Sequence, residues 1–265
     1  MGRLVVVKGG GDLATGIVHR LFRAGFSVVV TEIAQPTVIR RTVAFAAAVY
    51  DGEVAVEGVS AVRCELGRAL AVAGRGSVPV VVDPQASCVA YLRPLAVVDA
   101  IIAKENTGTA LSDAPVVIGV GPGFAAGVDV HAVIETMRGH DLGRVILHGP
   151  AAANTGIPGE IGGYNRERLI KAPAAGVFKA AAAIGDVVEA GDTVAYVGDA
   201  PVRATIGGVL RGLLHDGLTV PKGLKVGDID PRCQVQHCFT ISDKARAVGG
   251  GVLEALMMFS ERTGK

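Results

Sequence analysis

The first hundred residues alternate between short apolar runs and amphipathic stretches. Short runs rich in Val are typical of buried strands, and apolar positions three and four apart are typical of helices. The pattern predicts strands over residues 4–7, 27–31 and 78–82 and helices over residues 14–24, 38–49 and 65–73. This alternation indicates a parallel sheet with right-handed crossovers.

The pattern changes after residue 105. An apolar strand over residues 116–120 runs into Gly121-Pro-Gly123, and apolar segments at 133–136 and 144–147 flank a polar turn. The two segments predict a hairpin. The stretch 149–163 is rich in Gly, Pro and Asn, and we expect it to connect two domains.

An internal repeat follows within residues 172–230. Ala175–Lys179 is echoed 32 positions later by Gly207–Arg211, and Gly185 is echoed by Gly217 at the same offset. Two short β units that pair about a pseudo-dyad are typical of a biotinyl/lipoyl-like barrel-sandwich hybrid. The stretch 193–206 between the halves contains no Lys, so we expect no biotin or lipoate attachment.

These patterns predict an α/β fold with a Rossmann-like parallel-sheet domain and a β-rich barrel-sandwich-hybrid module. The expected domains are a nucleotide-binding domain with an edge hairpin over 1–165, the β module over 166–232, and a C-terminal segment over 233–265. An amphipathic helix over 252–259 is expected to close that segment.

Composition narrows the function classes. The 265 residues are 50% hydrophobic and 19% charged, with a mean hydropathy of +0.45, so the chain is expected to fold rather than remain disordered. No apolar run is long enough to span a membrane, and we expect no signal peptide because the first residues run straight into a strand-like segment. The net charge of +1 gives no reason to expect nucleic-acid binding. We expect a cytoplasmic protein without a disulfide framework, and a homodimer on base rates.

The main candidate for chemistry is Gly9-x-Gly11-x-x-Ala14, which directly follows a strand and begins a helix. Gly9, Gly10 and Gly11 allow a tight turn and close backbone approach, and the helix N-terminus faces a pyrophosphate. Glu32 ends the second strand, where an acidic residue binds ribose hydroxyls. This order predicts a dinucleotide-binding site; a tight turn without a ligand is the alternative.

Asp12 departs from the motif because its charge lies beside the expected phosphate. It is either part of the binding loop or a residue that caps the helix.

A second cluster follows the strand around residue 97. Asp99, Lys104 and Asn106 lie where ligands bind in open α/β sheets, beyond a strand's carboxyl end. Lys104 is positioned to bind an anion and Asn106 to donate an amide. A loop salt bridge with an Asn turn is an equally good interpretation.

The C-terminal segment contains Cys233, His237 and Cys238. This spacing is not a standard zinc pattern, so we expect no metal site. Cys238 is a candidate reactive thiol, with His237 or Lys244 lowering its pKa, and a buried inert Cys is the alternative.

Several motifs together resemble the accessory-protein family of the selenium-dependent molybdenum hydroxylase system, a relative of the xanthine dehydrogenase accessory factor. They are Lys8–Gly16, Thr31–Pro36, Phe45–Gly52, Gly121–Phe124, Val133–Thr136, Arg138–His140, Gly227–Arg232, Cys238–Lys244 and Gly249–Val252.

The resemblance implies a maturation role. Such a protein would bind the molybdenum pterin cofactor or a nucleotide and act on the apo molybdenum hydroxylase, with Cys238 relaying sulfur or selenium. One alternative is an NAD-dependent oxidoreductase, because Glu32 would repel the 2′-phosphate of NADP. Another is a non-catalytic scaffold that docks the hydroxylase.

Overall fold

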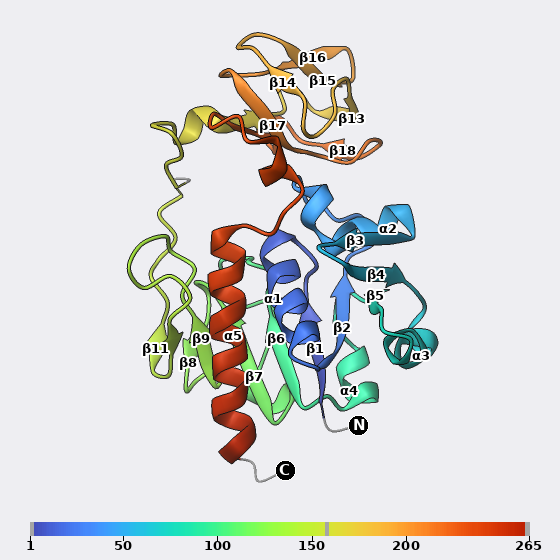
Figure 1. The fold of residues 1–265 in the computed structure, drawn as a ribbon, viewed down its shortest axis with the longest axis vertical. Coiled ribbons are helices and arrows are strands. Elements are labelled where there is room, and N and C mark those ends of the chain that lie inside the picture. The colour runs from blue at the N-terminus through green and yellow to red at the C-terminus, as the bar shows by residue number, and fades with distance from the viewer. Residues whose placement is uncertain (1–2, 157–158, 263–265) are drawn as a thin grey trace. The chain divides into compact units, whose positions relative to one another are not determined.

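The computed structural model describes residues 3–156 and 159–262, and the chain divides into two compact units (Figure 1). Unit 1 comprises Met1–Pro36, Ala44–Thr155 and Ile241–Lys265, and unit 2 comprises Thr37–Val43 and Gly156–Thr240. Unit 1 is therefore discontinuous in sequence. No helix in the described ranges has both the length and the apolar character needed to cross a membrane.

A nine-stranded sheet forms the centre of unit 1, in the order β10-β9-β7-β6-β1-β2-β5-β4-β3. Its strands are β1 (Leu4–Lys8), β2 (Ser27–Glu32), β3 (Glu53–Val56), β4 (Val59–Arg63), β5 (Val78–Val82), β6 (Ala96–Asp99), β7 (Val116–Val120), β9 (Ala132–Ile134) and β10 (Val145–Ile146). A separate pair consists of β8 (Ala125–Ala126) and β11 (Gly149–Pro150). The central strands read as continuous Val runs because both faces of the sheet are covered.

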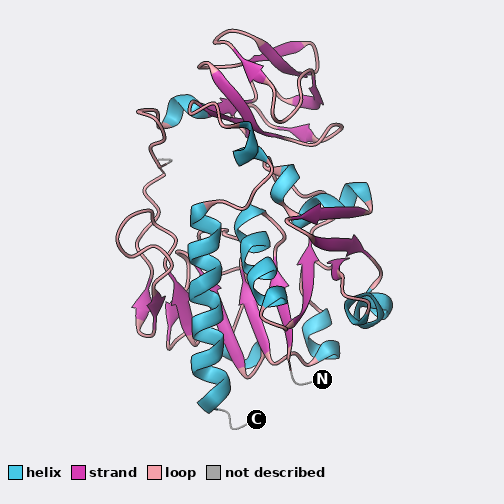
Figure 2. Ribbon diagram, in the orientation of Figure 1, coloured by secondary structure: helices cyan, strands magenta, loops and turns pink. Residues whose placement is uncertain are grey.

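Helices cover the two faces of this sheet (Figure 2). The α-helices of unit 1 are α1 (Asp12–Arg23), α2 (Ala48–Asp51), α3 (Ala69–Gly74), α4 (Cys88–Leu92) and α5 (Asp243–Arg262); its 3-10 helices are η2 (Phe45–Ala47), η3 (Leu66–Arg68) and η4 (Leu111–Asp113). Leu4 and Val6 pack with residues of α3 and α4 on one face. The opposite face is covered by α1 and α5, which run side by side.

Glycines allow α5 to lie very close to its neighbours. A Cβ built on Gly16 would lie 2.7 Å from the Cβ of Ala245, and one on Gly249 would lie 2.8 Å from the Gly16 carbonyl oxygen. Gly251 approaches the Gly143 carbonyl oxygen still more closely. Gly249 and Gly251 are therefore positions of close packing within the helix, whereas a Cβ on Gly250 would meet nothing within 4 Å.

The strand pair β3–β4 is antiparallel. Its turn residues Glu57 and Gly58 have φ values of 46° and 81°, as in the type I′ turns of two-residue hairpins. The Glu57 carboxylate accepts hydrogen bonds from the Ile241 N–H at 2.9 Å and from Arg246 at 2.6 Å. Burial raises the pKa of Glu57, but these donors outweigh burial, and the pKa is lowered.

The predicted helix over residues 38–49 is wrong. This stretch contains only η1 (Arg41–Val43), η2 and the start of α2. The N–H of Phe45 donates to the Thr15 hydroxyl at 2.8 Å, and the N–H of Ala46 donates to the Gly10 carbonyl at 2.8 Å. These donors bind α1 and the preceding loop in place of the carbonyls that a helix would offer.

Unit 2 contains two four-stranded antiparallel sheets, in the orders β12-β19-β17-β14 and β16-β15-β13-β18. The strands are β12 (Leu169–Lys171), β13 (Gly176–Ala180), β14 (Val187–Val188), β15 (Thr193–Val197), β16 (Ala200–Arg203), β17 (Gly208–Leu213), β18 (Thr219–Val220) and β19 (Lys225–Asp230), and the 3-10 helices are η1, η5 (Arg166–Arg168) and η6 (Val235–Cys238). The repeat is visible in the pairing, because β13 of the first copy pairs with β18 of the second, and β17 of the second pairs with β14 of the first.

The predicted fold class is wrong in both parts. The large sheet is mixed rather than parallel, because the turn at Glu57 and Gly58 reverses the chain between β3 and β4, and β10 pairs antiparallel with β9. Unit 2 consists of two separate sheets, each with a strand outside the repeated pairs, β12 in one and β16 in the other. Nothing in it shows a biotinyl/lipoyl barrel-sandwich module.

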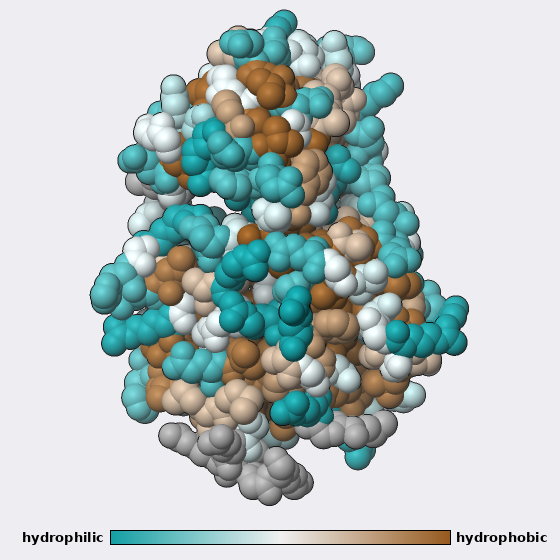
Figure 3. Space-filling model, viewed as in Figure 1, coloured by the Kyte–Doolittle hydropathy of each residue, from teal (hydrophilic) through white to brown (hydrophobic). Residues whose placement is uncertain are grey.

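The surface of unit 2 carries several large hydrophobic side chains. Val187 is 69% exposed and Val177 is 53% exposed. In the view of Figure 3, hydrophobic residues on this unit lie among hydrophilic ones.

Candidate functional site

The chemically distinctive residues of unit 1 gather at the carboxyl ends of three adjacent strands. Lys8 ends β1, Glu32 ends β2 and Asp99 ends β6, and β1 lies between the other two strands. The chain order reverses at β1, because β2 follows on one side and β6 on the other. In open α/β sheets, ligands bind outside the carboxyl ends of the strands at such a reversal.

The loop Gly9–Gly11 connects β1 to α1 at this edge. Gly9 has a φ of 90°, and its added Cβ would lie 3.1 Å from the Ile101 Cα. A Cβ on Gly10 would lie 2.8 Å from the Ala46 nitrogen. A Cβ on Gly11 would meet nothing within 4 Å. Packing therefore requires the first two glycines, whereas the space above Gly11 is open.

Gly11 is also the N-cap of α1, with φ −63° and ψ −179° and no side-chain cap. The first turn of α1 therefore begins beside the open space at Gly11. The backbone N–H groups of a first helical turn have no acceptor within their own helix and favour an anion.

Glu32 is fixed across the mouth of the loop. Its Oε1 accepts a hydrogen bond from the Gly10 N–H at 2.8 Å, and its Oε2 accepts one from the Ile33 N–H at 2.8 Å. Burial raises the pKa of Glu32, and the two hydrogen bonds oppose that shift. Each carboxylate oxygen retains a second acceptor site.

A buried polar triad lies at the ends of β1 and β6. Lys8 Nζ donates to the Thr109 hydroxyl at 2.5 Å and lies 3.1 Å from Asp99 Oδ2. The Thr109 hydroxyl donates to the same Asp99 oxygen at 2.5 Å. Both charged side chains are less than 10% exposed. A buried ion pair that Thr109 also bridges by hydrogen bonds holds the two strand ends together.

The lysine that pairs with Asp99 is therefore Lys8, and Lys104, the candidate for anion binding, is not part of this triad. Lys104 is exposed, with a φ of 71°, in the loop after β6. Asn106 Oδ1 accepts hydrogen bonds from the N–H groups of Gly108 and Thr109 at 2.9 and 2.8 Å, so this side chain forms the turn that presents Thr109. In the sequence, the signal that could have identified Lys8 is its charge directly after the apolar run of β1.

Two exposed apolar side chains flank the loop. Ile33 directly follows Glu32 and is 46% exposed, and Ile101 follows β6 by two residues and is 41% exposed. Tyr50 is close enough to Glu32 that burial and then the charge of Glu32 raise the pKa of the phenol. The loop thus has acceptors, apolar surface and helix N–H groups around it.

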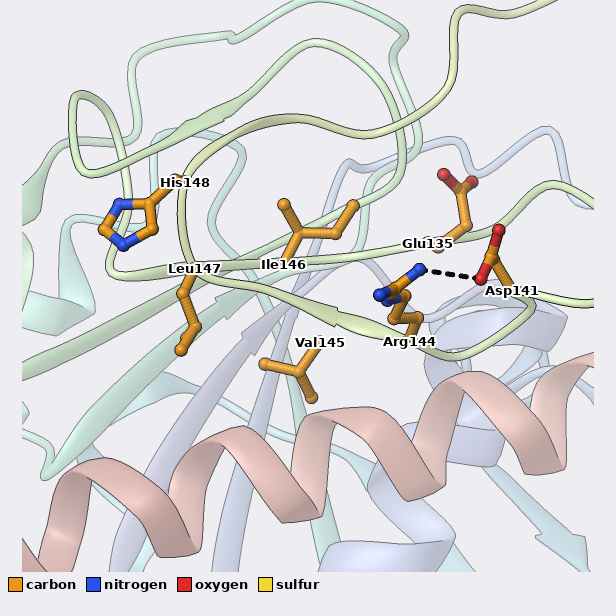
Figure 4. Close-up of a pocket in the computed structure, with 7 residues that line it drawn as sticks. All are labelled: Glu135, Asp141, Arg144, Val145, Ile146, Leu147 and His148. Carbon is orange, nitrogen blue, oxygen red and sulfur yellow. Dashed lines mark hydrogen bonds and ion pairs between the residues drawn. The ribbon is translucent and has the colours of Figure 1, made fainter.

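A pocket of about 470 Å³ lies along the β9–β10 edge of the same sheet (Figure 4). Asp141 and Arg144 form an ion pair at 2.9 Å within it. Glu135, which also lines the pocket, accepts hydrogen bonds from the N–H groups of Met137 at 2.7 Å and Ala152 at 2.8 Å. These charged groups already have protein partners, so the loop at Gly11 is the better candidate site.

Cys238 lies in unit 2, at the end of η6. The residue is fully buried, and its thiol contacts the Leu210 carbonyl oxygen at 3.8 Å. Burial raises the pKa of this thiol. The packing interpretation therefore fits Cys238 better than a reactive thiolate. Within residues 3–156 and 159–262, no group of three or more His, Cys, Asp or Glu is arranged to hold a metal ion.

Comparisons with known proteins give one close sequence relative. Uncharacterized protein YqeB of Escherichia coli (strain K12) is 54% identical over 257 residues, covering 97% of this chain and 48% of the relative. The chain thus spans about half the length of the curated relative that it matches. No family model matches the chain.

The solved structures are much more distant. An aspartoacylase family protein from Mesorhizobium loti is 11% identical with a TM-score of 0.26, covering 86% of this chain and 85% of that one. A succinylglutamate desuccinylase/aspartoacylase from Rhodobacter sphaeroides is 13% identical with a TM-score of 0.27 and the same coverage. Likenesses at this level transfer neither a site nor an activity to the chain.

The predicted family and function are corrected on these comparisons. The proteins that they name are an uncharacterized protein and aspartoacylase or desuccinylase structures, and nothing among them points to a molybdenum hydroxylase accessory factor. The maturation role, its selenium-dependent chemistry and the oxidoreductase and scaffold alternatives are therefore withdrawn.

Proposed function

We propose that unit 1 binds a nucleoside phosphate at the loop Gly9–Gly11, with the phosphate above Gly11 and the ribose hydroxyls on Glu32. The contrast among the three glycines carries this proposal. Gly9 and Gly10 lack a Cβ because atoms of distant residues occupy its place, whereas a Cβ on Gly11 would meet no atom of a distant described residue within 4 Å. A ligand that approaches the backbone closely is a physical reason for glycine there.

The surrounding chemistry supports the same ligand class. Glu32 offers acceptors to a vicinal diol, and its carboxylate is oriented by the Gly10 N–H and the Ile33 N–H. The exposed side chains of Ile33 and Ile101 offer apolar contact to a planar base. Strands on either side of a central strand lie about 10 Å apart, which leaves room for a base between residues that follow β2 and β6.

Calorimetric titration of the full chain with ADP, GDP, CDP and UDP tests the proposal. We expect at least one nucleotide to bind, and its 2′-deoxy form to bind more weakly because Glu32 loses a hydroxyl donor. Glu32→Gln should reduce that ribose preference.

Gly11→Asn provides the sharpest variant. Asn is a good N-cap residue, so the helix should form while the side chain fills the space of the phosphate. Gly67→Asn is a matched control, because a Cβ on Gly67 also meets nothing within 4 Å. Absence of binding by all four nucleotides, or equal binding by the Gly11→Asn variant, would overturn the proposal.

A further inference from the structure

Lys244 carries a half-buried ammonium group at the start of α5. It is the second residue of α5, and within the described part of the chain it makes neither a hydrogen bond nor an ion pair. Its neighbour Asp243 instead binds Arg138, through two contacts of 2.7 and 3.1 Å. A partly desolvated cation is stabilised by nearby negative charge, which carboxylates of the protein or an anionic ligand can supply.

The packing of α5 brings Lys244 to the start of α1. The next residue, Ala245, lies against Gly16, where the added Cβ would come within 2.7 Å of its own. Asp12 lies four residues before Gly16 and therefore on the same face of α1, one turn closer to the loop. Figure 1 shows the two helices running side by side, with both N-termini at the carboxyl edge of the sheet.

The electrostatic surroundings agree with this placement. Burial lowers the pKa of Lys244, the Arg138 charge lowers it further, and Asp12, Glu135 and Asp243 oppose the shift. The Asp12 carboxylate thus lies within electrostatic range of the Lys244 ammonium, although the two groups form no ion pair. This arrangement gives a reason for the acidic residue beside the glycine loop, since the lysine offsets its repulsion of an anion.

We propose that Lys244 is a phosphate-binding residue of this site, and that its ammonium contacts the phosphate of a nucleotide held above Gly11. The inference rests on the proposed function, and it adds a residue from the far end of the chain to that site. Lys244 acts with the N-terminus of α1 on the phosphate, whereas Glu32 acts on the ribose.

The test repeats the titrations of the full chain with ADP, GDP, CDP and UDP on Lys244→Ala, Lys244→Arg and Lys222→Ala. Lys222 is an exposed lysine of unit 2 and serves as the control. Loss of one charge-assisted contact should weaken nucleotide binding about tenfold in Lys244→Ala. Lys244→Arg should retain most of the affinity, and Lys222→Ala should bind like the wild-type protein.

The preference for a 2′-hydroxyl over a 2′-deoxy nucleotide shows whether the loss of affinity comes from the phosphate or from the ribose. Lys244→Ala should keep the wild-type preference for the 2′-hydroxyl nucleotide, whereas Glu32→Gln should reduce it. Wild-type affinity in Lys244→Ala, or an equal loss in Lys244→Arg, would overturn the role of Lys244 alone. A wild-type protein that binds none of the four nucleotides would overturn the proposed function and this inference together.

Discussion

The contrast between Gly10 and Gly11 gives a stability prediction that needs no ligand. A serine Cβ at position 10 would lie 2.8 Å from the Ala46 nitrogen and 3.3 Å from a methyl carbon of Val30. Backbone must move to relieve the first contact, because the Ala46 N–H donates to the Gly10 carbonyl. We expect Gly10→Ser to destabilise unit 1 by about 1–3 kcal/mol, the usual cost of overpacking.

The same substitution at position 11 should have the opposite outcome. Its Cβ meets nothing within 4 Å, and serine at an N-cap accepts a hydrogen bond from the first turn of the helix. We expect Gly11→Ser to be as stable as the wild-type protein or slightly more stable.

Thermal unfolding of the two variants, followed by circular dichroism, measures the difference. For domains of 150–250 residues, a loss of about 1–3 kcal/mol corresponds to a decrease in Tm of about 2–12 °C. An unchanged Tm in Gly10→Ser, or an equal decrease in both variants, would refute the reasoning from backbone contact.

Three further predictions concern stability. Lys8→Met leaves the buried Asp99 carboxylate without its cation, so urea denaturation should show a loss of about 3–5 kcal/mol. Although burial alone would raise it, hydrogen bonds leave the pKa of Glu57 lowered. Glu57 therefore stabilises the folded state at pH values above its pKa in the unfolded chain, and this stabilisation is lost as the pH falls through its pKa in the folded protein. Glu57→Gln should cost about 0.5–1 kcal/mol at pH 7 and flatten the acid limb of a stability–pH profile. In α5, Gly251→Ala should destabilise by about 3 kcal/mol or more because its Cβ meets a backbone oxygen. Gly250→Ala, which meets nothing within 4 Å, should stabilise the helix by about 1 kcal/mol.

Each of these three has an outcome that contradicts it. A stability of Lys8→Met within 1 kcal/mol of the wild-type value would contradict the role of the triad. A stability–pH profile of Glu57→Gln that runs parallel to the wild-type profile at acid pH would contradict the assignment of the acid limb to Glu57. Equal melting temperatures for the two glycine variants would contradict the close approach of α5.

Local sequence patterns predicted the Val strands and the loop at Gly9 well. The runs at 4–7, 27–31, 78–82 and 116–120 all lie in strands, because a strand buried on both faces needs continuous apolar character. Glu32 ends β2 as predicted from the spacing. The helix over 65–73 corresponds to η3 and α3 together.

Long-range contacts explain what the sequence could not predict. The Ala46 N–H donates to the Gly10 carbonyl, and the Phe45 N–H donates to the Thr15 hydroxyl. Residues 38–49 therefore form short helical turns instead of the continuous helix that their composition favours. In the sequence, Lys8 looks only like the polar end of a strand. Its ion pair with Asp99 forms because β6 pairs with β1 and places the two residues side by side. Lys244 lies over two hundred residues from the glycine loop, and no local pattern connects the two.

The discontinuity of unit 1 also affects the order in which the protein is made. The face of α1 that carries Gly16 is covered by α5, which begins at Asp243, after the whole of unit 2. At synthesis rates of about 5–20 residues per second, residues of α1 wait on the order of ten seconds or more for that helix. During this interval the nascent sheet presents an uncovered apolar face while the inserted β unit folds. We therefore expect newly made chains to be a substrate for chaperones that bind near the ribosome, and we expect the packing of α5 against α1 to end that dependence.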